Sequence, residues 1–225
     1  MLETRLTQLL GCKYPIVQTA MGWVADPRLV AGSCNAGAFG FLAGATIPAQ
    51  EMERDILRVK ELTDQPFGVN FHMYQPNAAQ IVDLVIRHGV RAVSYSRSPG
   101  PEFIKKLKDA GVVCMPTIGL PKHATKAVEL GADAVTVQGG EGGGHTGAVP
   151  TTLLIPQVVD AVEYPGADIH QDFLYIRHKD YLFPALPALE RVADNPVNTL
   201  GISLHGVKLE SSLEHTAMQA GESLF

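Results

Sequence analysis

Short apolar runs alternate with amphipathic stretches through the first 162 residues of the chain. Most of these runs are continuously apolar rather than alternating, which is the pattern of strands covered on both faces, as in parallel sheets. We therefore predict six parallel β-strands, at residues 14–20, 39–43, 67–72, 92–96, 112–118 and 134–138.

The stretches between the apolar runs have the spacing of amphipathic helices. Residues 50–62 place Met52, Ile56 and Val59 on one helical face, with charged residues on the opposite face. The same pattern recurs in 79–88 and 102–110. A glycine follows each of three predicted helices, where a left-handed cap is common; these are Gly89, Gly111 and Gly131.

Strict alternation of strand and helix indicates parallel strands joined by right-handed crossovers. Six such units occupy residues 1–162. Eight units at the same rate would need just over ~200 residues, which is near the lower end of the range for closed β/α barrels. We therefore predict an α/β fold, a parallel (β/α)8 TIM-type barrel that is incomplete, with six recognisable units.

The pattern changes abruptly at Glu163. Residues 163–225 hold four of the eight histidines and show no strand–glycine–helix unit. Residues 180–193 and 211–220 are candidates for short helices. We divide the chain into a barrel portion, 1–162, and an atypical C-terminal segment, 163–225. Three explanations stay open: a rearranged or frame-shifted chain, a variant in which the segment covers the gap in the barrel, or a sequence that omits parts of a longer molecule.

Composition narrows the class of protein. The net charge is −5, and the lysines and arginines are scattered, which argues against a nucleic-acid partner or a polybasic membrane surface. No apolar run approaches the roughly 20 residues of a membrane span, and the N-terminus lacks the layout of a secretion signal. The three cysteines are far apart and fit neither a disulfide scaffold nor a metal site. We expect a cytoplasmic protein.

The segment 137–147, VQGGEGGGHTG, carries the strongest chemical signal and follows the sixth predicted strand. Six glycines in eleven residues favour close approach of backbone to a flat ring or a phosphate, because glycine destabilises helices and strands. His145 is a natural proton acceptor, since the pKa of histidine lies near ~6.5. Glu141 could orient His145 or simply cap the loop. A flexible linker is the alternative, but a strand and a helix flank this segment.

Two other strand ends support the same picture more weakly. The segment 18–23, QTAMGW, suits backbone contact with a planar ligand. An ordinary turn with a packed methionine would have the same sequence pattern. Asn70 lies near the end of a buried strand, where its amide needs partners from a ligand or from neighbouring backbone. His72 is more typical of a rim or structural position than of a catalytic one.

Taken together, PIVQTAMGWV, PFGVNFH and VQGGEGGGHTG resemble the nitronate monooxygenase family over residues 6–162. Within that family they are most similar to the IpdC-type actinobacterial reductases, which are linked to breakdown of steroid-ring CoA thioesters. The resemblance implies non-covalent FMN at the carboxyl-terminal mouth of the barrel. His145 would be the catalytic proton-transfer residue. The implied FMN-binding residues are Ala20, Met21, Gly22, Asn70, Gln138, Gly143 and Gly144.

The resemblance also implies a small-molecule substrate. This would be a nitronate or nitroalkane to be oxidised, or an enone or acyl-CoA to be reduced with NAD(P)H as the candidate reductant. The family's two phosphate-binding patterns, Pro-Val-Ile-Ala-Ala-Gly-Gly and Met-Gly-Thr-Arg-Phe, do not occur after Val162. The alternative is therefore an inactive or flavin-free remnant of the family. A phosphosugar isomerase barrel is disfavoured by the pattern of Gln138 and His145.

Overall fold

The computed structural model describes residues 3–45, 47–96, 101–141, 146–162, 175–178 and 181–184. Six consecutive strands pair in parallel and in chain order, which confirms the predicted parallel sheet. They are β1 (Val17–Gln18), β2 (Phe39–Ala43), β3 (Gly68–His72), β4 (Ala92–Ser96), β5 (Val113–Ile118) and β6 (Thr136–Val137).

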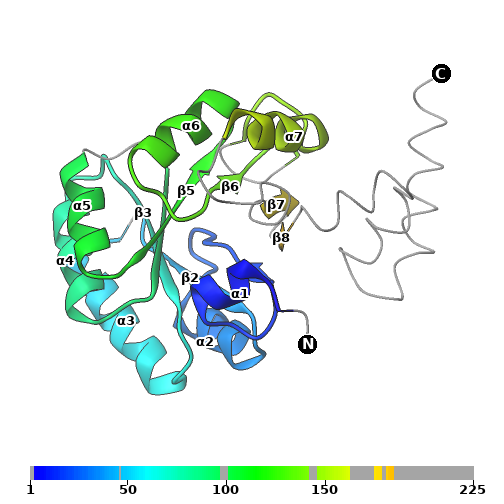
Figure 1. Cartoon of the computed structure of the whole chain (residues 1–225). Coiled ribbons are helices and arrows are strands. Elements are labelled where there is room, and N and C mark those ends of the chain that lie inside the picture. The colour runs from blue at the N-terminus through cyan, green and yellow to red at the C-terminus, as the bar shows by residue number, and fades with distance from the viewer. Residues whose placement is uncertain are drawn as a thin grey trace.

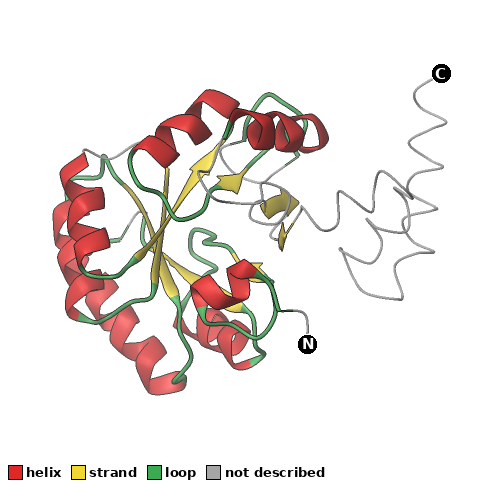
Figure 2. Ribbon diagram, viewed as in Figure 1, coloured by secondary structure: helices red, strands yellow, loops and turns green. Residues whose placement is uncertain are grey.

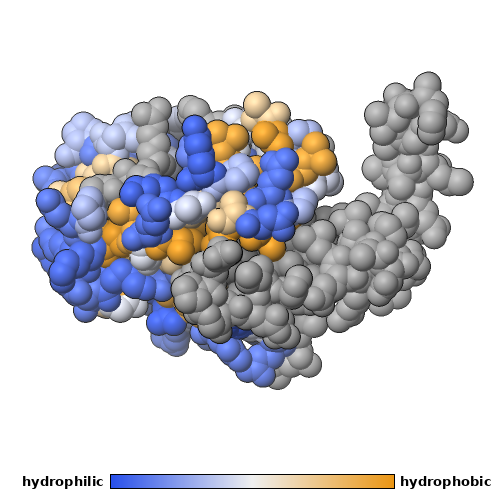
Figure 3. Space-filling view, turned by 45° about the horizontal axis from the view of Figure 1, so that its top comes forward, coloured by the Kyte–Doolittle hydropathy of each residue, from blue (hydrophilic) through white to orange (hydrophobic). Residues whose placement is uncertain are grey.

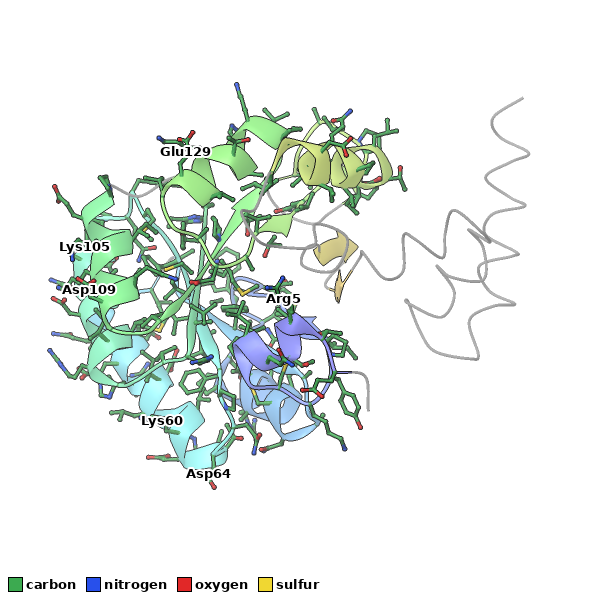
Figure 4. The ribbon with its side chains drawn as sticks, viewed as in Figure 1. Arg5, Lys60, Asp64, Lys105, Asp109 and Glu129 are labelled. Carbon is green, nitrogen blue, oxygen red and sulfur yellow. The ribbon has the colours of Figure 1, made fainter. Side chains whose placement is uncertain are left out.

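Helices lie outside the curled sheet and form an arc around it (Figures 1 and 2). Charged side chains such as Lys60, Lys105 and Glu129 point away from the strands, as the amphipathic patterns predicted (Figure 4). The glycine caps are confirmed, because Gly89, Gly111 and Gly131 have φ values of 61°, 73° and 90°. The helices are α1 (Arg5–Leu10), α2 (Pro27–Asn35), α3 (Ala49–Leu62), α4 (Ala78–Arg87), α5 (Pro101–Asp109), α6 (Pro121–Glu129) and α7 (Thr151–Ala161).

A hairpin takes the two remaining positions of the barrel. Strand β7 (Tyr175–His178) pairs in parallel with β6, and β8 (Tyr181–Pro184) pairs antiparallel with both β7 and β1. The strand pairing therefore closes into a ring. The predicted helix over 180–193 is wrong at 181–184. An extended segment gains backbone hydrogen bonds from the open sheet edges, and a short helix would leave those edges unpaired.

The amino-terminal end of the barrel is filled by apolar side chains. Leu6 and Leu10 of α1 pack against the first residues of the strands, including Val17, Phe39 and Val113. Thr4 begins α1 with a reciprocal capping bond to Thr7. We call the apolar cluster around Leu6 and Leu10 the apolar plug. The sequence analysis missed α1, which the structure shows to close this end of the barrel.

The surface carries both charged and apolar groups. On the face drawn in Figure 3, apolar patches lie between charged side chains. Trp23 is 91% exposed, the most exposed of the large hydrophobic side chains among the described residues. Within the same part of the chain, no helix is long and apolar enough to cross a membrane.

Half-buried Cys12 and buried Cys114 make the fold sensitive to alkaline pH. Burial raises the pKa of Cys12 to about 11 and that of Cys114 to about 12. In the unfolded chain these thiols ionise near a pKa of ~8.5. The stability that they contribute is therefore complete below that pH and is lost as the pH rises toward 11–12.

We expect the melting temperature to fall between pH 8.5 and 11, and the fall to be smaller in Cys114→Ser, whose hydroxyl does not titrate in this range. Thermal melts across the range would test this expectation. An identical pH dependence in the two proteins would contradict it.

Candidate functional site

Above the apolar plug, the inside of the barrel becomes polar. Small polar side chains from several strands surround a cavity of about 30 Å³, into which Ala20 and Phe41 also project. Alternate residues on the same strands, such as Val69 and Val93, belong instead to the cluster that packs against the helices. We call the polar set the polar layer; it consists of Thr19, Asn70, Ser94, Thr117 and Thr136.

Asn70 has a defined orientation in the polar layer. Its amide nitrogen Nδ2 donates to the backbone carbonyl and to the hydroxyl of Ser94, both at 3.1 Å. The two residues are register partners on β3 and β4. Because a carbonyl oxygen only accepts, the nitrogen of the amide must face Ser94. The amide oxygen Oδ1 is thereby left as the acceptor that Asn70 can offer to a ligand.

The loop after β1 places a second polar group beside the cavity. Gln18 Nε2 donates to the carbonyls of Thr19 (2.5 Å) and Phe41 (3.2 Å), which tie this loop to β2. Thr19 is only 7% exposed, and its buried hydroxyl oxygen has no hydrogen-bond partner among the described residues. Ala20 lines the same cavity.

The next residues form a turn at the mouth. The carbonyl of Met21 accepts from the N–H groups of Val24 and Ala25, at 3.0 and 2.9 Å. Trp23 has a φ of 61°, a strained value for a residue with a side chain. A Cβ added to Gly22 would meet no described atom within 4 Å, so this side of the turn is open.

The two stems of the glycine-rich loop are fastened to each other. The N–H of Gly140 donates to the carbonyl of Val149 at 3.0 Å. The carboxylate of Glu141 accepts from the backbone N–H of Thr151 at 2.9 Å and from its hydroxyl at 2.6 Å. A Cβ on Gly139 would overlap Thr151, so the clamp requires glycine there. These bonds make Glu141 a cap at the N-terminus of α7, and its relation to His145 lies outside the described residues.

The remaining predicted residues divide into two groups. Gln138 is 6% exposed, and its backbone N–H donates to the carbonyl of Ile118 at 2.9 Å, just beyond the paired ends of β5 and β6. Gly143, Gly144 and His145 lie outside the described residues. The structure therefore places Ala20 and Asn70 around one cavity, and it fixes both ends of the loop that carries His145.

His72 lies at the rim, two residues beyond Asn70 on the same strand. Its Nδ1 is 2.5 Å from the hydroxyl of Ser96, its register partner on β4. Its ring stacks on Tyr74, with centroids 5.2 Å apart and planes 16° apart. These contacts hold the imidazole in place at the mouth, in agreement with the rim position expected from the sequence.

Four members of the polar layer escaped the sequence analysis: Thr19, Ser94, Thr117 and Thr136. A signal for them was present. Each is a small polar residue within or beside an otherwise apolar strand, at a position whose neighbours face the helices. In parallel strands, alternation of small polar residues with apolar residues that face the helices indicates that the inside of the barrel is polar.

Both a family model and individual relatives match most of the barrel portion of the chain. The family model for nitronate monooxygenase matches residues 3–84 and 78–167. Over 164 residues the chain is 57% identical to a (3aS,4S,5R,7aS)-5-hydroxy-7a-methyl-1-oxo-octahydro-1H-indene-4-carboxyl-CoA dehydrogenase of Rhodococcus jostii, a match that covers 73% of this chain and 46% of the relative. A probable nitronate monooxygenase of Staphylococcus saprophyticus is 31% identical over 211 residues, covering 73% of this chain and 59% of the relative.

Solved structures show the same likeness. FabK of Thermotoga maritima superimposes with a TM-score of 0.70 at 31% identity, covering 72% of this chain and 52% of FabK. A nitroalkane oxidase of Streptomyces ansochromogenes gives 0.64 at 31% identity, covering 71% and 58%. The chain spans about half the length of the dehydrogenases that it matches. By its sequence motifs, its parallel barrel strands and the extent of the family match, the chain belongs to the nitronate monooxygenase family.

Proposed function

We propose that this chain is an FMN-dependent oxidoreductase that binds its flavin at the mouth of the barrel and acts on a CoA thioester. The observation that carries the proposal is the polar layer, which presents the Asn70 amide oxygen and the Thr19 hydroxyl beside an internal cavity. The CoA thioester follows from the name of the Rhodococcus jostii relative, which is 57% identical over the shared part.

The described residues fit a flavin. Its ring has an edge that carries carbonyl oxygens and an N–H group, and such an edge needs both donors and acceptors from the protein. Asn70 offers an acceptor, and Thr19 has a buried hydroxyl that no described protein atom satisfies. The open side of Gly22 leaves room for a flat ring to approach the turn after β1.

We assign roles to the residues as follows. FMN, when bound, supplies hydride or electron transfer, and the protein supplies orientation and electrostatics. Asn70 and Gln138 would hold the cofactor by hydrogen bonds, and Ala20, Met21 and Gly22 would line its ring. His145, with Gly143 and Gly144 beside it, holds or accepts the proton that moves at the substrate. The clamp between Glu141 and Thr151 fastens the two stems of this loop to each other.

Nitronate oxidation is the second candidate activity. It is favoured by the Staphylococcus saprophyticus relative and by the Streptomyces ansochromogenes structure, which are named for nitronate and nitroalkane oxidation. Both activities would use the same flavin site. They differ in whether the flavin is first reduced by NAD(P)H or by the substrate itself.

Absorbance and turnover together test the proposal. The purified protein, incubated with FMN, is expected to show flavin bands. NAD(P)H with an enoyl- or ring-derived acyl-CoA, and a pre-ionised nitronate with oxygen, would then be compared as substrates. Turnover of the CoA thioester alone supports the proposal, and turnover of the nitronate alone supports the second candidate. A protein that binds no FMN would be the flavin-free remnant of the family.

We expect FMN to bind weakly to this chain. Residues 163–225 contain neither of the two phosphate-binding patterns that the family resemblance leads one to expect. Charge-assisted hydrogen bonds to a phosphate contribute roughly 1.5–3 kcal/mol each, so losing two or three weakens binding by orders of magnitude. Flavin fluorescence titration is expected to give a dissociation constant in the micromolar range or above. A submicromolar value would show that other residues hold the phosphate.

A further inference from the structure

We infer that the Thr19 hydroxyl is a flavin-binding group, the hydrogen-bond partner of the polar edge of the isoalloxazine next to Asn70. This inference rests on the proposed function. Thr19 is more than nine-tenths buried, and its side chain borders the cavity of the polar layer. Within the part of the chain that the structure describes, its hydroxyl oxygen has no protein partner.

The surroundings of Thr19 explain why the protein leaves this hydroxyl without a partner. The side-chain amide nitrogen of the preceding residue, Gln18 Nε2, already donates to two backbone carbonyls. Across the cavity, the donor of Asn70 is committed to Ser94. A buried hydroxyl without a hydrogen bond destabilises a folded protein, so such groups are rare unless a ligand satisfies them.

The two groups that face the cavity, Asn70 Oδ1 and the Thr19 hydroxyl, are complementary to a flavin. Asn70 Oδ1 can only accept, whereas a threonine hydroxyl can donate or accept. Together they match an edge in which an N–H group stands beside carbonyl oxygens. Ser94 acts as a positioning residue in this arrangement, because its carbonyl and hydroxyl fix which way the Asn70 amide faces.

Thr19→Val separates this role from a structural one, because the two states of the protein should respond in opposite directions. Without FMN, the variant loses an unsatisfied buried hydroxyl, and its melting temperature is expected to rise by about 2–4 °C. With FMN, it loses a hydrogen bond, and its flavin dissociation constant is expected to rise about 2- to 10-fold. Thr19→Ser keeps the hydroxyl and is expected to retain the flavin affinity of the original protein.

Thr63→Val is the matched control. Thr63 is also buried, but its hydroxyl already donates to Asn35 Oδ1 at 2.6 Å. It lies at the carboxyl-terminal end of α3 and does not line the cavity of the polar layer. This variant is expected to melt at a lower temperature and to bind FMN unchanged. The measurements are thermal melts with and without saturating FMN, together with flavin fluorescence titrations of the full chain.

The outcomes are distinct. Higher stability without FMN combined with weaker FMN binding in Thr19→Val supports the assignment. Unchanged FMN affinity in Thr19→Val overturns it while leaving the proposed function intact. Equal weakening by Thr19→Val and Thr19→Ser also overturns it, because packing and not the hydroxyl would then be responsible. Failure of the original protein to bind FMN overturns both this inference and the proposed function.

Discussion

Replacing His145 with alanine is expected to slow nitroalkane oxidation by about 10²–10⁴-fold, the usual contribution of a general base. His145 is the one titratable nitrogen base in the glycine-rich segment. His145 itself lies outside the described residues, and the structure shows the two clamped stems on either side of it in the sequence. Steady-state rates with a neutral nitroalkane would measure the effect.

A pre-ionised nitronate provides the internal comparison. It needs no proton removed, so its oxidation should be affected much less by His145→Ala, and flavin content should barely change. If the chain instead reduces a CoA thioester, the variant should lose that reduction while NAD(P)H still reduces the flavin. His123→Ala, an exposed histidine on α6, serves as control and should change neither rate. Equal losses on nitroalkane and nitronate would assign His145 to binding rather than to proton transfer.

Glu141→Ala is expected to lower the free energy of unfolding by about 1.5–3 kcal/mol, because the charged hydrogen bonds to the first residue of α7 are lost. For a chain of this size the melting temperature should fall by roughly 3–12 °C. The variant should also bind FMN less well, since the two stems of the glycine-rich loop would be held by the Gly140–Val149 bond alone among the contacts described above. Thermal melts and flavin titration measure the two effects.

Glu61→Ala is the matched control for this prediction. Glu61 pairs with Arg58 on the exposed face of α3, and such surface pairs contribute at most ~1 kcal/mol. Its removal should leave flavin binding unchanged. If Glu141→Ala and Glu61→Ala had equal effects on stability, the cap at α7 would contribute nothing beyond an ordinary surface charge.

The regular part of the fold could be predicted because the apolar runs, the helical spacing and the glycine caps all indicate the same alternation of strand and helix. The strands at 39–43 and 92–96 lie where the apolar runs are, and glycine occupies the cap positions with positive φ. Helix α1 was missed because it is only six residues long, too short for its apolar spacing to stand out. The hairpin of β7 and β8 was missed because its place depends on pairing with β1 and β6, which are far away in the sequence.

Site residues could be predicted where they belong to a distinctive sequence motif. They could not be predicted where their role depends on which side chains the strands bring together inside the barrel. Asn70 and Gln138 stood out because polar side chains interrupt apolar strands next to distinctive segments. Ser94 also interrupts an apolar strand, but no distinctive segment adjoins it, and its importance comes from the register that puts it opposite Asn70. The sequence could not show that the Thr19 hydroxyl lacks a hydrogen-bond partner among the described residues. That property depends on which acceptors the amide nitrogens of Gln18 and Asn70 bind in the folded chain.

The direction of β8 changes what the last strand of this barrel can contribute. In a barrel of eight parallel strands, the loops after the seventh and eighth strands commonly build the phosphate site. Here β8 runs opposite to β1, so Pro184 at its carboxyl end lies level with Tyr175 at the start of β7. Seven strands therefore end at the mouth instead of eight. On the β7–β8 side, the phosphate or other anionic group of a ligand at the mouth must therefore be bound by the connection at 179–180 or by the preceding loops.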